Sequence, residues 1–372
     1  MSETPRLYAN IGAEEGEPPQ RASTGRAETA VEQAWRALFE PPLYAWLEPA
    51  GQLFAWLNTD AARAQAKDAG VALAGADPAI VRRVHDKAFA HEVACRESLL
   101  PPELARAIAV LDPESLRDAD AGVAAIAAAL AAWPEALRAR FTLKPRFGSS
   151  GRGRVAGTAG VADTPEIRGA LPRLAERGGA LLEPWCERTE DLSASLRIGA
   201  AGEILLLGTT RQWLTPAGLY RGQRGTFDTK ARVTADSPHD ERLREAAVVV
   251  ARAAFAAGYV GPAGLDAFAY RSADGSIALR PAVEWNARFT VGLVAIGLLR
   301  RHRAAIVKAF RLRAPERLAF HFGLEAPPAG WPTARETIRT FPIRPGGVDS
   351  GPALVLARDR ETLEQELGEA PA

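Results

Sequence analysis

Residues 141–153, with the sequence FTLKPRFGSSGRG, hold the first side chains that could do chemistry. A short apolar run ends at Lys144, and a loop with three glycines and two serines follows. Glycines let backbone amides approach a ligand closely, and the lysine adds a mobile positive charge, so the loop suits a polyphosphate. Its lysine precedes the glycines and it lacks Gly-x-Gly-x-x-Gly, which excludes a Walker A loop and the dinucleotide fingerprint. A flexible linker, or an Arg-Gly segment that contacts nucleic acid, has a similar composition, so the loop alone decides nothing.

A second polar stretch, VEWNAR at residues 283–288, could hold a metal ion. Alternate side chains of a strand share a face, so Glu284, Asn286 and Arg288 would point the same way. Carboxylate and amide oxygens suit Mg²⁺, and the arginine could hold phosphate oxygens. Asp266 lies in the preceding predicted strand of the same hairpin, which places a second carboxylate across from Glu284. A polar strand face at a sheet edge would explain Glu-x-Asn-x-Arg alone, but with Asp266 and the glycine-rich loop we favour a Mg-nucleotide site.

A third stretch, LLEPWC at residues 181–186, is an apolar run that enters a kink at Pro184. Backbone groups exposed at such a kink can read the edge of an adenine. Asp191 follows Glu183 by eight positions and can accept hydrogen bonds from ribose hydroxyls. In isolation, a strand-to-loop junction with solvated charges is the better explanation of this stretch.

The first 80 residues alternate between strand and helix patterns, which predicts a small α/β domain. The periodicity and the turn signals predict strands and helices along the whole chain. Strands are expected at 6–12, 53–57, 71–74, 155–161, 180–182, 193–198, 204–210, 264–270, 277–285 and 353–357. Helices are expected at 28–39, 60–69, 78–99, 113–132, 164–177, 239–257, 293–310 and 360–367. Residues 215–232 are polar and rich in glycine, which predicts a long binding or covering loop.

Composition excludes several classes of protein. The 46 Lys and Arg residues nearly balance the 45 Asp and Glu residues, so no bulk field attracts nucleic acid or an anionic membrane. No apolar run approaches the ~20 residues that span a bilayer, and the N-terminus lacks a signal-peptide pattern. Cys95 and Cys186 lie far apart without metal-ligand spacing, so no disulfide framework is expected and a reducing cytoplasm fits.

In order and spacing, these segments resemble the ATP-grasp superfamily over roughly residues 80–300. The matching positions are Asp86-Lys87, Leu143-Lys144-Pro145, the loop 147–153, Glu183-Pro184-Trp185 with Asp191, Asp266, and Glu284-x-Asn286-x-Arg288. The resemblance implies an α+β / α/β fold in which two α+β lobes clasp ATP after a small α/β pre-ATP-grasp domain. The implied domains are 1–85 for the N-terminal α/β domain, 86–310 for the ATP-grasp domain with its lid-bearing lobe at about 140–190, and 311–372 for a C-terminal extension packed on it.

The resemblance also implies a role for each matching residue. Lys87 and Lys144 resemble the two lysines that hold the ATP phosphates. The mobile lid over the phosphates corresponds to Gly148, Ser149, Ser150, Gly151 and Gly153. The adenine-contacting hinge corresponds to Glu183, Pro184 and Trp185, and the ribose position to Asp191. Two positions depart from the family pattern: Pro184 stands where an acidic residue is frequent, and Ala287 stands where proline is frequent.

The implied Mg²⁺ ligands are Asp266, Glu284 and Asn286, with Glu284 bridging two ions for which Mn²⁺ could substitute. Arg288 resembles the arginine beside the γ-phosphate, and with Lys144 it forms the implied catalytic pair. Three further arginines lie where relatives often hold a substrate carboxylate: Arg197, Arg221 and Arg224.

The implied reaction is ATP-dependent ligation of a carboxylate to an amine through an acylphosphate, which releases ADP and phosphate. Its substrates would be small molecules or amino-acid-like or peptide-like compounds. A phosphotransferase with the same fold, and a regulatory protein that binds ATP without turnover, are the alternatives. No nucleic acid or membrane partner is expected, and a homodimer is compatible with the sequence.

Overall fold

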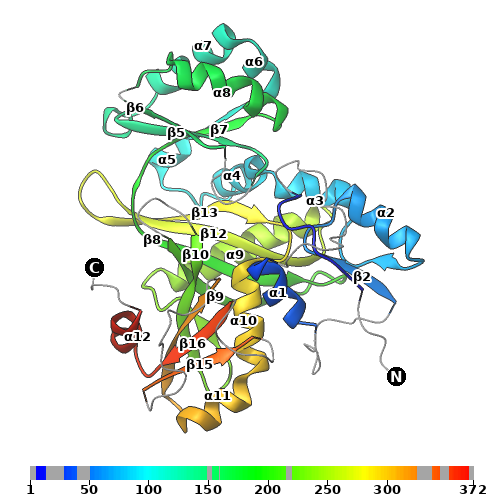
Figure 1. The fold of residues 1–372 in the computed structure, drawn as a ribbon. Coiled ribbons are helices and arrows are strands. Elements are labelled where there is room, and N and C mark those ends of the chain that lie inside the picture. The colour runs from blue at the N-terminus through cyan, green and yellow to red at the C-terminus, as the bar shows by residue number, and fades with distance from the viewer. Residues whose placement is uncertain are drawn as a thin grey trace.

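Three β-sheets organise the protein in this computed structural model (Figure 1). The structure describes residues 6–13, 29–39, 51–148, 153–158, 160–214, 220–324, 337–343 and 352–367. The first sheet has three strands, the second has four and the third has nine. No helix of the described residues is long and apolar enough to cross a membrane.

The three-stranded sheet forms the N-terminal α/β unit that the sequence predicts. Its parallel strands are β1 (Arg6–Tyr8), β2 (Gln52–Ala55) and β3 (Ala72–Leu73), and its helices are α1 (Ala30–Ala37) and α2 (Asp60–Asp68). Trp35 of α1 is fully buried and packs edge-on against Trp56 and Phe289, with ring centroids 6.1 and 5.6 Å away. This aromatic cluster attaches the unit to the rest of the molecule.

The four-stranded sheet belongs to a separate lobe with its own hydrophobic core (upper part of Figure 1). Its strand order is β4 (Ala109–Leu111), β7 (Ala180–Pro184), β5 (Arg140–Pro145) and β6 (Val155–Thr158), all antiparallel. The helices of this small lobe are α6 (Pro113–Arg117), α7 (Ala119–Ala131) and α8 (Pro165–Glu176). The sequence pattern did not predict α5 (Pro102–Ala107), β4 or the 3₁₀ turn Glu135–Leu137.

The nine-stranded sheet forms the body of the protein and is antiparallel throughout. Its strands are β8 (Glu187–Ile198), β9 (Ile204–Leu214), β10 (Tyr220–Asp228), β11 (Val233–Thr234), β12 (Gly261–Arg271), β13 (Ile277–Asn286), β14 (Arg317–Gly323), β15 (Ile338–Pro342) and β16 (Ala353–Ala357). The main path runs β13-β12-β8-β9-β10-β14-β16-β15, and β11 pairs with β10. Helix α12 (Arg360–Glu366) packs against β14 and β16, so the last part of the chain completes this sheet.

Three predicted helices are each interrupted in the structure. Residues 78–99 form α3 (Pro78–His85) and α4 (Lys87–Arg96), because Asp86 adopts an extended backbone and caps α4 through the Ala88 amide at 2.9 Å. Asp118 interrupts 113–132 in the same way. Residues 293–310 form α10 (Val291–Arg301) and α11 (Arg303–Phe310). The first interruption matters most, because it puts Lys87 at the buried start of α4.

The prediction of a long loop at 215–232 was wrong for its described part. Residues 220–228 form β10, which lies between β9 and β14 in the middle of the large sheet. A Cβ atom at Gly222 would lie 2.2 Å from the Phe322 carbonyl oxygen, and one at Gly225 would lie 2.4 Å from the Thr234 carbonyl oxygen. These glycines therefore permit close strand packing, whereas in the sequence they suggest a loop.

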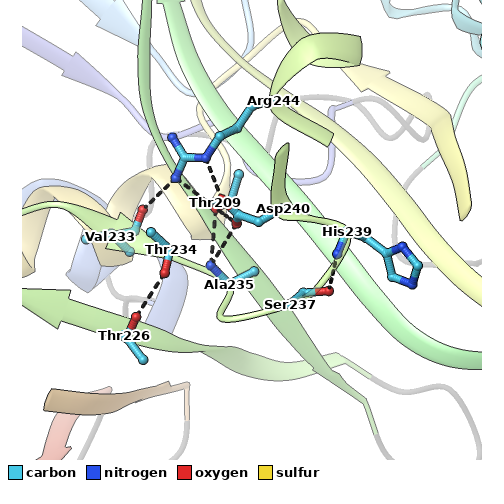
Figure 2. Close-up of polar contacts among 9 residues, drawn as sticks. All are labelled: Thr209, Thr226, Val233, Thr234, Ala235, Ser237, His239, Asp240 and Arg244. Carbon is cyan, nitrogen blue, oxygen red and sulfur yellow. Dashed lines mark hydrogen bonds and ion pairs between the residues drawn. The ribbon is translucent and has the colours of Figure 1, made fainter. Parts of the chain in front are cut away.

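A polar cluster fastens helix α9 (Asp240–Ala256) to the large sheet (Figure 2). The Asp240 carboxylate accepts hydrogen bonds from the Thr209 hydroxyl, from the Ala235 amide at 3.2 Å and from Arg244 Nε at 2.5 Å. Arg244 also donates to the Val233 carbonyl at 3.2 Å. The cluster thus ties the first turns of α9 to β9 and β11, and its charged groups pair with each other.

Candidate functional site

A cleft of about 390 Å³ lies between the small lobe and the large sheet. The small lobe contributes Lys144, Pro145, Gly148 and Arg154, and α4 contributes Lys87. The strands of the large sheet supply most of the other wall, with Asp191, Ser193, Gln212, Tyr220, Gln223, Asp266, Glu284 and Asn286. The structure therefore gathers the three predicted metal ligands around one space with four of the predicted nucleotide residues: Lys87, Lys144, Gly148 and Asp191.

Two carboxylates face each other in this cleft, as the hairpin pattern predicts. Asp266 of β12 is directly opposite Glu284 of β13 in the antiparallel register. Asn286 Nδ2 donates to Asp266 Oδ2 at 3.0 Å, and Gln212 Nε2 donates to Asp266 Oδ1 at 2.8 Å. Burial raises the pKa of Asp266 to about 6, and the charge of Glu284 adds to the rise. The pair is thus an acidic site that a cation would stabilise.

The donor set fits a hard divalent cation. Asn286 Oδ1 is buried and accepts no hydrogen bond from the described residues, so an oxygen ligand stands unused beside the two carboxylates. No group of three His, Cys, Asp or Glu residues in the described ranges could hold a metal by itself. Mg²⁺ commonly takes one or two protein carboxylates and completes its shell with water and substrate phosphates. The site therefore suits a cation that binds together with a polyphosphate.

Two lysine side chains line the same cleft as the acidic pair. Lys87 Nζ lies 3.1 Å from Glu284 Oε1 and donates to the Gly148 carbonyl at 2.6 Å. Lys144 Nζ forms an ion pair with Glu183 Oε1. Burial lowers the pKa of Lys144 to about 8 despite that ion pair. Both lysines line the cleft, where they can offset phosphate charge.

Glu183 forms a buried ionic link between the two lobes. It belongs to β7 of the small lobe, and its Oε2 lies 2.8 Å from an Arg280 nitrogen of β13 in the large sheet. Glu183 is 2% exposed and Arg280 is 1% exposed. Burial alone would raise the pKa of Glu183, but Arg280 and Lys144 outweigh it and lower the pKa to about 2. Arg280 was not predicted as a site residue, because its only signal in the sequence is its position inside a predicted strand.

The predicted adenine hinge lies beside the cleft and does not line it. The guanidinium groups of Arg140 and Arg154 both lie over the Trp185 ring, 5.1 and 4.6 Å from its centroid. The Trp185 amide donates to the Arg140 carbonyl at 2.9 Å. The cleft wall near this point consists instead of Arg154, Arg188 and Phe268, with Arg188 stacked on the Phe268 ring at 4.3 Å. Asp191 lines the cleft and pairs with Arg188 at 2.6 Å.

The remaining predicted residues are divided between several places. Gly148 lines the cleft, Gly153 lies at the start of the next described segment, and Ser149, Ser150 and Gly151 lie outside the described residues. Arg288 lines the cleft and also a second cavity, where it is joined by Arg197.

The two other arginines predicted to bind the substrate, Arg221 and Arg224, line neither the cleft nor the second cavity. Arg224 of β10 stacks on Trp213 at 4.5 Å and donates to His321 at 3.2 Å. Two strands, β9 and β8, separate β10 from β12 of the acidic pair. Successive side chains of a strand point to opposite faces, and Gln223 lines the cleft, so Arg224 points away from it. Arg221 does not line the cleft, and its backbone carbonyl accepts a hydrogen bond from the Leu324 amide at 3.3 Å.

No protein-family model matches the sequence, and no curated protein matches it. Solved structures match it over most of its length. An ADP complex of N5-carboxyaminoimidazole ribonucleotide synthetase has 12% identity and a TM-score of 0.53, with 99% of this chain and 96% of that chain covered. A biotin carboxylase from Campylobacter jejuni, in complex with β-γ-ATP, has 14% identity and a TM-score of 0.52, with coverage of 85% and 73%.

The chain has the ATP-grasp fold. The fold that the motifs implied is thereby confirmed, with the small N-terminal unit, the lobe that bears the glycine-rich segment and the large antiparallel sheet all present. A third match, N5-carboxyaminoimidazole synthetase from Staphylococcus aureus, has 11% identity, covers 86% of this chain and 80% of that chain, and has a TM-score of 0.50. At such identities the likeness establishes the ATP-grasp architecture alone.

Proposed function

We propose that this protein is an ATP-dependent ligase that joins a carboxylate to an amine through an acylphosphate and releases ADP and phosphate. The observation that carries the proposal is the Asp266–Glu284 pair, with the unused Asn286 oxygen beside it, in a cleft that two lysines also line. Acidic and basic groups are thus arranged as a metal–polyphosphate complex requires. The proposed substrates are a small carboxylic acid and an amine.

In this proposal Asp266, Glu284 and Asn286 would hold the Mg²⁺ ions, for which Mn²⁺ could substitute. The bound metal would offset charge on the β- and γ-phosphates. Lys87 and Lys144 contact phosphate oxygens, and Asp191 accepts from the ribose. Lys87 donates to the Gly148 carbonyl, which supports a place for it beside the start of the predicted phosphate loop.

Catalysis in this proposal is positioning and electrostatics. A substrate carboxylate oxygen attacks the γ-phosphorus in line, and the bond to the departing ADP oxygen breaks. The amine then attacks the activated carbonyl, loses a proton and expels phosphate. Arg288 lines the same cleft as the acidic pair, where it can stabilise charge in both steps. In this proposal, closure of the predicted lid at residues 147–153 would exclude water, which otherwise hydrolyses the acylphosphate.

We also propose the domain division 1–85, 86–310 and 311–372. Helix α3 ends at His85, and α11 ends at Phe310. The His85 ring accepts a hydrogen bond from the Ala287 amide at 3.1 Å, so this boundary lies against the end of β13. The lid-bearing lobe in this division contains β5, β6, α8 and β7.

The test is ADP release by the purified protein with Mg-ATP and a panel of acids, each with and without a panel of amines. A ligase releases ADP only when an acid and an amine are both present, and it forms the amide. ADP release with a phosphorylated product and no amine dependence would instead indicate a phosphotransferase. Mg-dependent ATP binding without ADP release under any combination would indicate a regulatory protein.

A further inference from the structure

A second cavity, of about 310 Å³, lies between the N-terminal α/β unit and the large sheet. One wall comes from β2 and the residues after it, including Phe54, Trp56 and Asn58. The other wall comes from the end of β8, the start of β12 and residues 287–289. The cavity is therefore formed by two structural units, and its volume suits a small molecule.

The charged side chains of this cavity are Arg197 and Arg288, and none of its described lining residues is acidic. Arg197 is half-buried, and within the described part of the chain its side chain makes no hydrogen bond or ion pair. The Arg288 guanidinium lies over the Trp56 ring at 5.7 Å and donates to the Phe289 carbonyl at 2.9 Å. Arg197 thus offers a positive charge without a partner among the described residues, in a partly apolar cavity, and this arrangement favours an anionic ligand.

The strand register connects this cavity to the acidic pair. On one face of the sheet, Ser193, Asp266 and Glu284 form a row, and Ser195, Gly264 and Asn286 form the next. Two residues further along each strand, the following row has Arg197 beside Pro262, with Arg288 beyond the end of β13. The face thus changes from carboxylates to arginines within two rows, and Arg288 lines both the cleft and the cavity.

We propose that this cavity holds the acid substrate, and that the acid carries a second anionic group. This inference rests on the proposed ligase function. The reacting carboxylate lies at Arg288, where one of its oxygens attacks the γ-phosphorus and the bond to ADP breaks. The second anionic group, a carboxylate or a phosphate, pairs with Arg197 and remains unchanged. The carbon chain between the two groups packs along Trp56 and Phe54.

The experiment compares the parent protein with Arg197→Gln and with the control Arg252→Gln, which changes an exposed arginine of α9. Calorimetry with Mg-ADP present measures the binding of straight-chain dicarboxylates from malonate to adipate, of the matching monocarboxylates, and of 3-phosphoglycerate. Thermal unfolding with Mg-ATP measures nucleotide binding separately. We expect Arg197→Gln to bind the preferred dianionic acid at least tenfold more weakly than the parent does. Its affinities for monocarboxylates and for Mg-ATP should equal those of the parent. Arg252→Gln should match the parent throughout.

The other outcomes are distinct. Preference for 3-phosphoglycerate over every dicarboxylate supports the proposal and identifies the second anionic group as phosphate. Equal binding of mono- and dicarboxylates, or binding unchanged by Arg197→Gln, overturns it and leaves the ligase proposal intact. Absence of binding by every anionic probe, while Mg-ATP still binds, overturns it as well. If Mg-ATP gives no thermal shift but dianionic acids bind through Arg197, the ligase proposal fails and the anion site stands.

Discussion

Glu183 and Asp266 are two buried carboxylates at the same cleft with opposite surroundings. Glu183 lies between Lys144 and Arg280, which hold its pKa at about 2. Asp266 faces another carboxylate and receives hydrogen bonds from neutral amides, and its pKa is raised to about 6. Lys144 and Arg280 compensate the charge of Glu183, whereas Asp266 forms no ion pair with any described residue, and a bound cation would compensate its charge. Buried charge at this cleft therefore has a structural role in one place and a binding role in the other.

The largest expected effect comes from removing the charge of Glu183, which Lys144 and Arg280 compensate. Glu183→Gln leaves Lys144 and Arg280 buried without a counter-ion, which should lower the free energy of unfolding by about 3–5 kcal/mol. Urea denaturation measures this change. The control Glu187→Gln alters an exposed glutamate of β8, the next strand along the chain, and its free energy of unfolding should stay within about 0.5 kcal/mol of the parent's. Equal stability of Glu183→Gln and the parent would mean that the ionic link does not hold the lobes together.

Removing a carboxylate of the acidic pair should affect activity far more than folding. Glu284→Gln relieves the repulsion with Asp266 and removes the ion pair with Lys87, and these two changes act on stability in opposite directions. ADP release should fall on the order of 10²–10³-fold, while the unfolding midpoint stays near that of the parent. The control Glu245→Gln changes an exposed residue of α9. Parent-like ADP release by Glu284→Gln, with the true substrates, would refute the metal assignment.

The two carboxylates should also respond differently to pH. The pKa of Asp266 is raised from 3.8, so its charge destabilises the fold above about pH 6, and this cost disappears as the pH falls toward 4. Glu183 has a lowered pKa, so its stabilisation is present above 4.5 and is lost as the pH falls toward 2. Protons should compete with Mg²⁺ for Asp266, which weakens Mg-dependent ATP binding by about tenfold per pH unit below 6.

Titration of the Mg²⁺-dependent thermal shift between pH 5 and pH 8 checks this prediction. Asp266→Asn should bind Mg-ATP weakly at every pH in that range and should lose the pH dependence. A parent protein whose Mg²⁺ response is flat across the range would show that Asp266 is ionised throughout.

The smallest expected effect comes from replacing Lys144, the lysine that forms an ion pair with Glu183. Lys144→Ala leaves Arg280 with Glu183 and removes one positive charge from the cleft wall. Affinity for Mg-ATP should fall by about tenfold, or ~1.4 kcal/mol, as calorimetry can measure. Lys308→Ala, at an exposed position of α11, is the matched control. If the two variants bind equally well, the phosphate role of Lys144 is wrong.

The acidic pair could be predicted because its geometry is local. A two-residue strand period and one hairpin suffice to place Asp266 across from Glu284, and the register confirms it. The partner of Glu183 could not be predicted in this way, because Arg280 follows it by almost a hundred residues and comes from another sheet. No local pattern in the sequence brings those two strands together.

Strand β10 shows a second limit of prediction from the sequence. Its glycines and polar residues suggest a loop, yet Gln223 faces the cleft and Gly222 allows close contact with β14. Polar residues that line a functional cleft weaken the hydrophobic pattern from which strands are predicted. The helix break at Asp86 had a visible signal, an aspartate able to cap a helix, but the continuous apolar periodicity on both sides of it favoured one long helix.

The strand order has a consequence for synthesis of the protein on the ribosome. Strand β10, which carries the cleft residues Tyr220 and Gln223, pairs with β14, and β14 pairs in turn with β16, at Ala353–Ala357. A nascent chain that has emerged only as far as α11 has β10 as an unpaired sheet edge, open to strands of other chains. The edge of β10 is therefore covered by β14 only when nearly all of the chain has left the ribosome. A premature stop codon before β14 should yield a protein that aggregates through this edge.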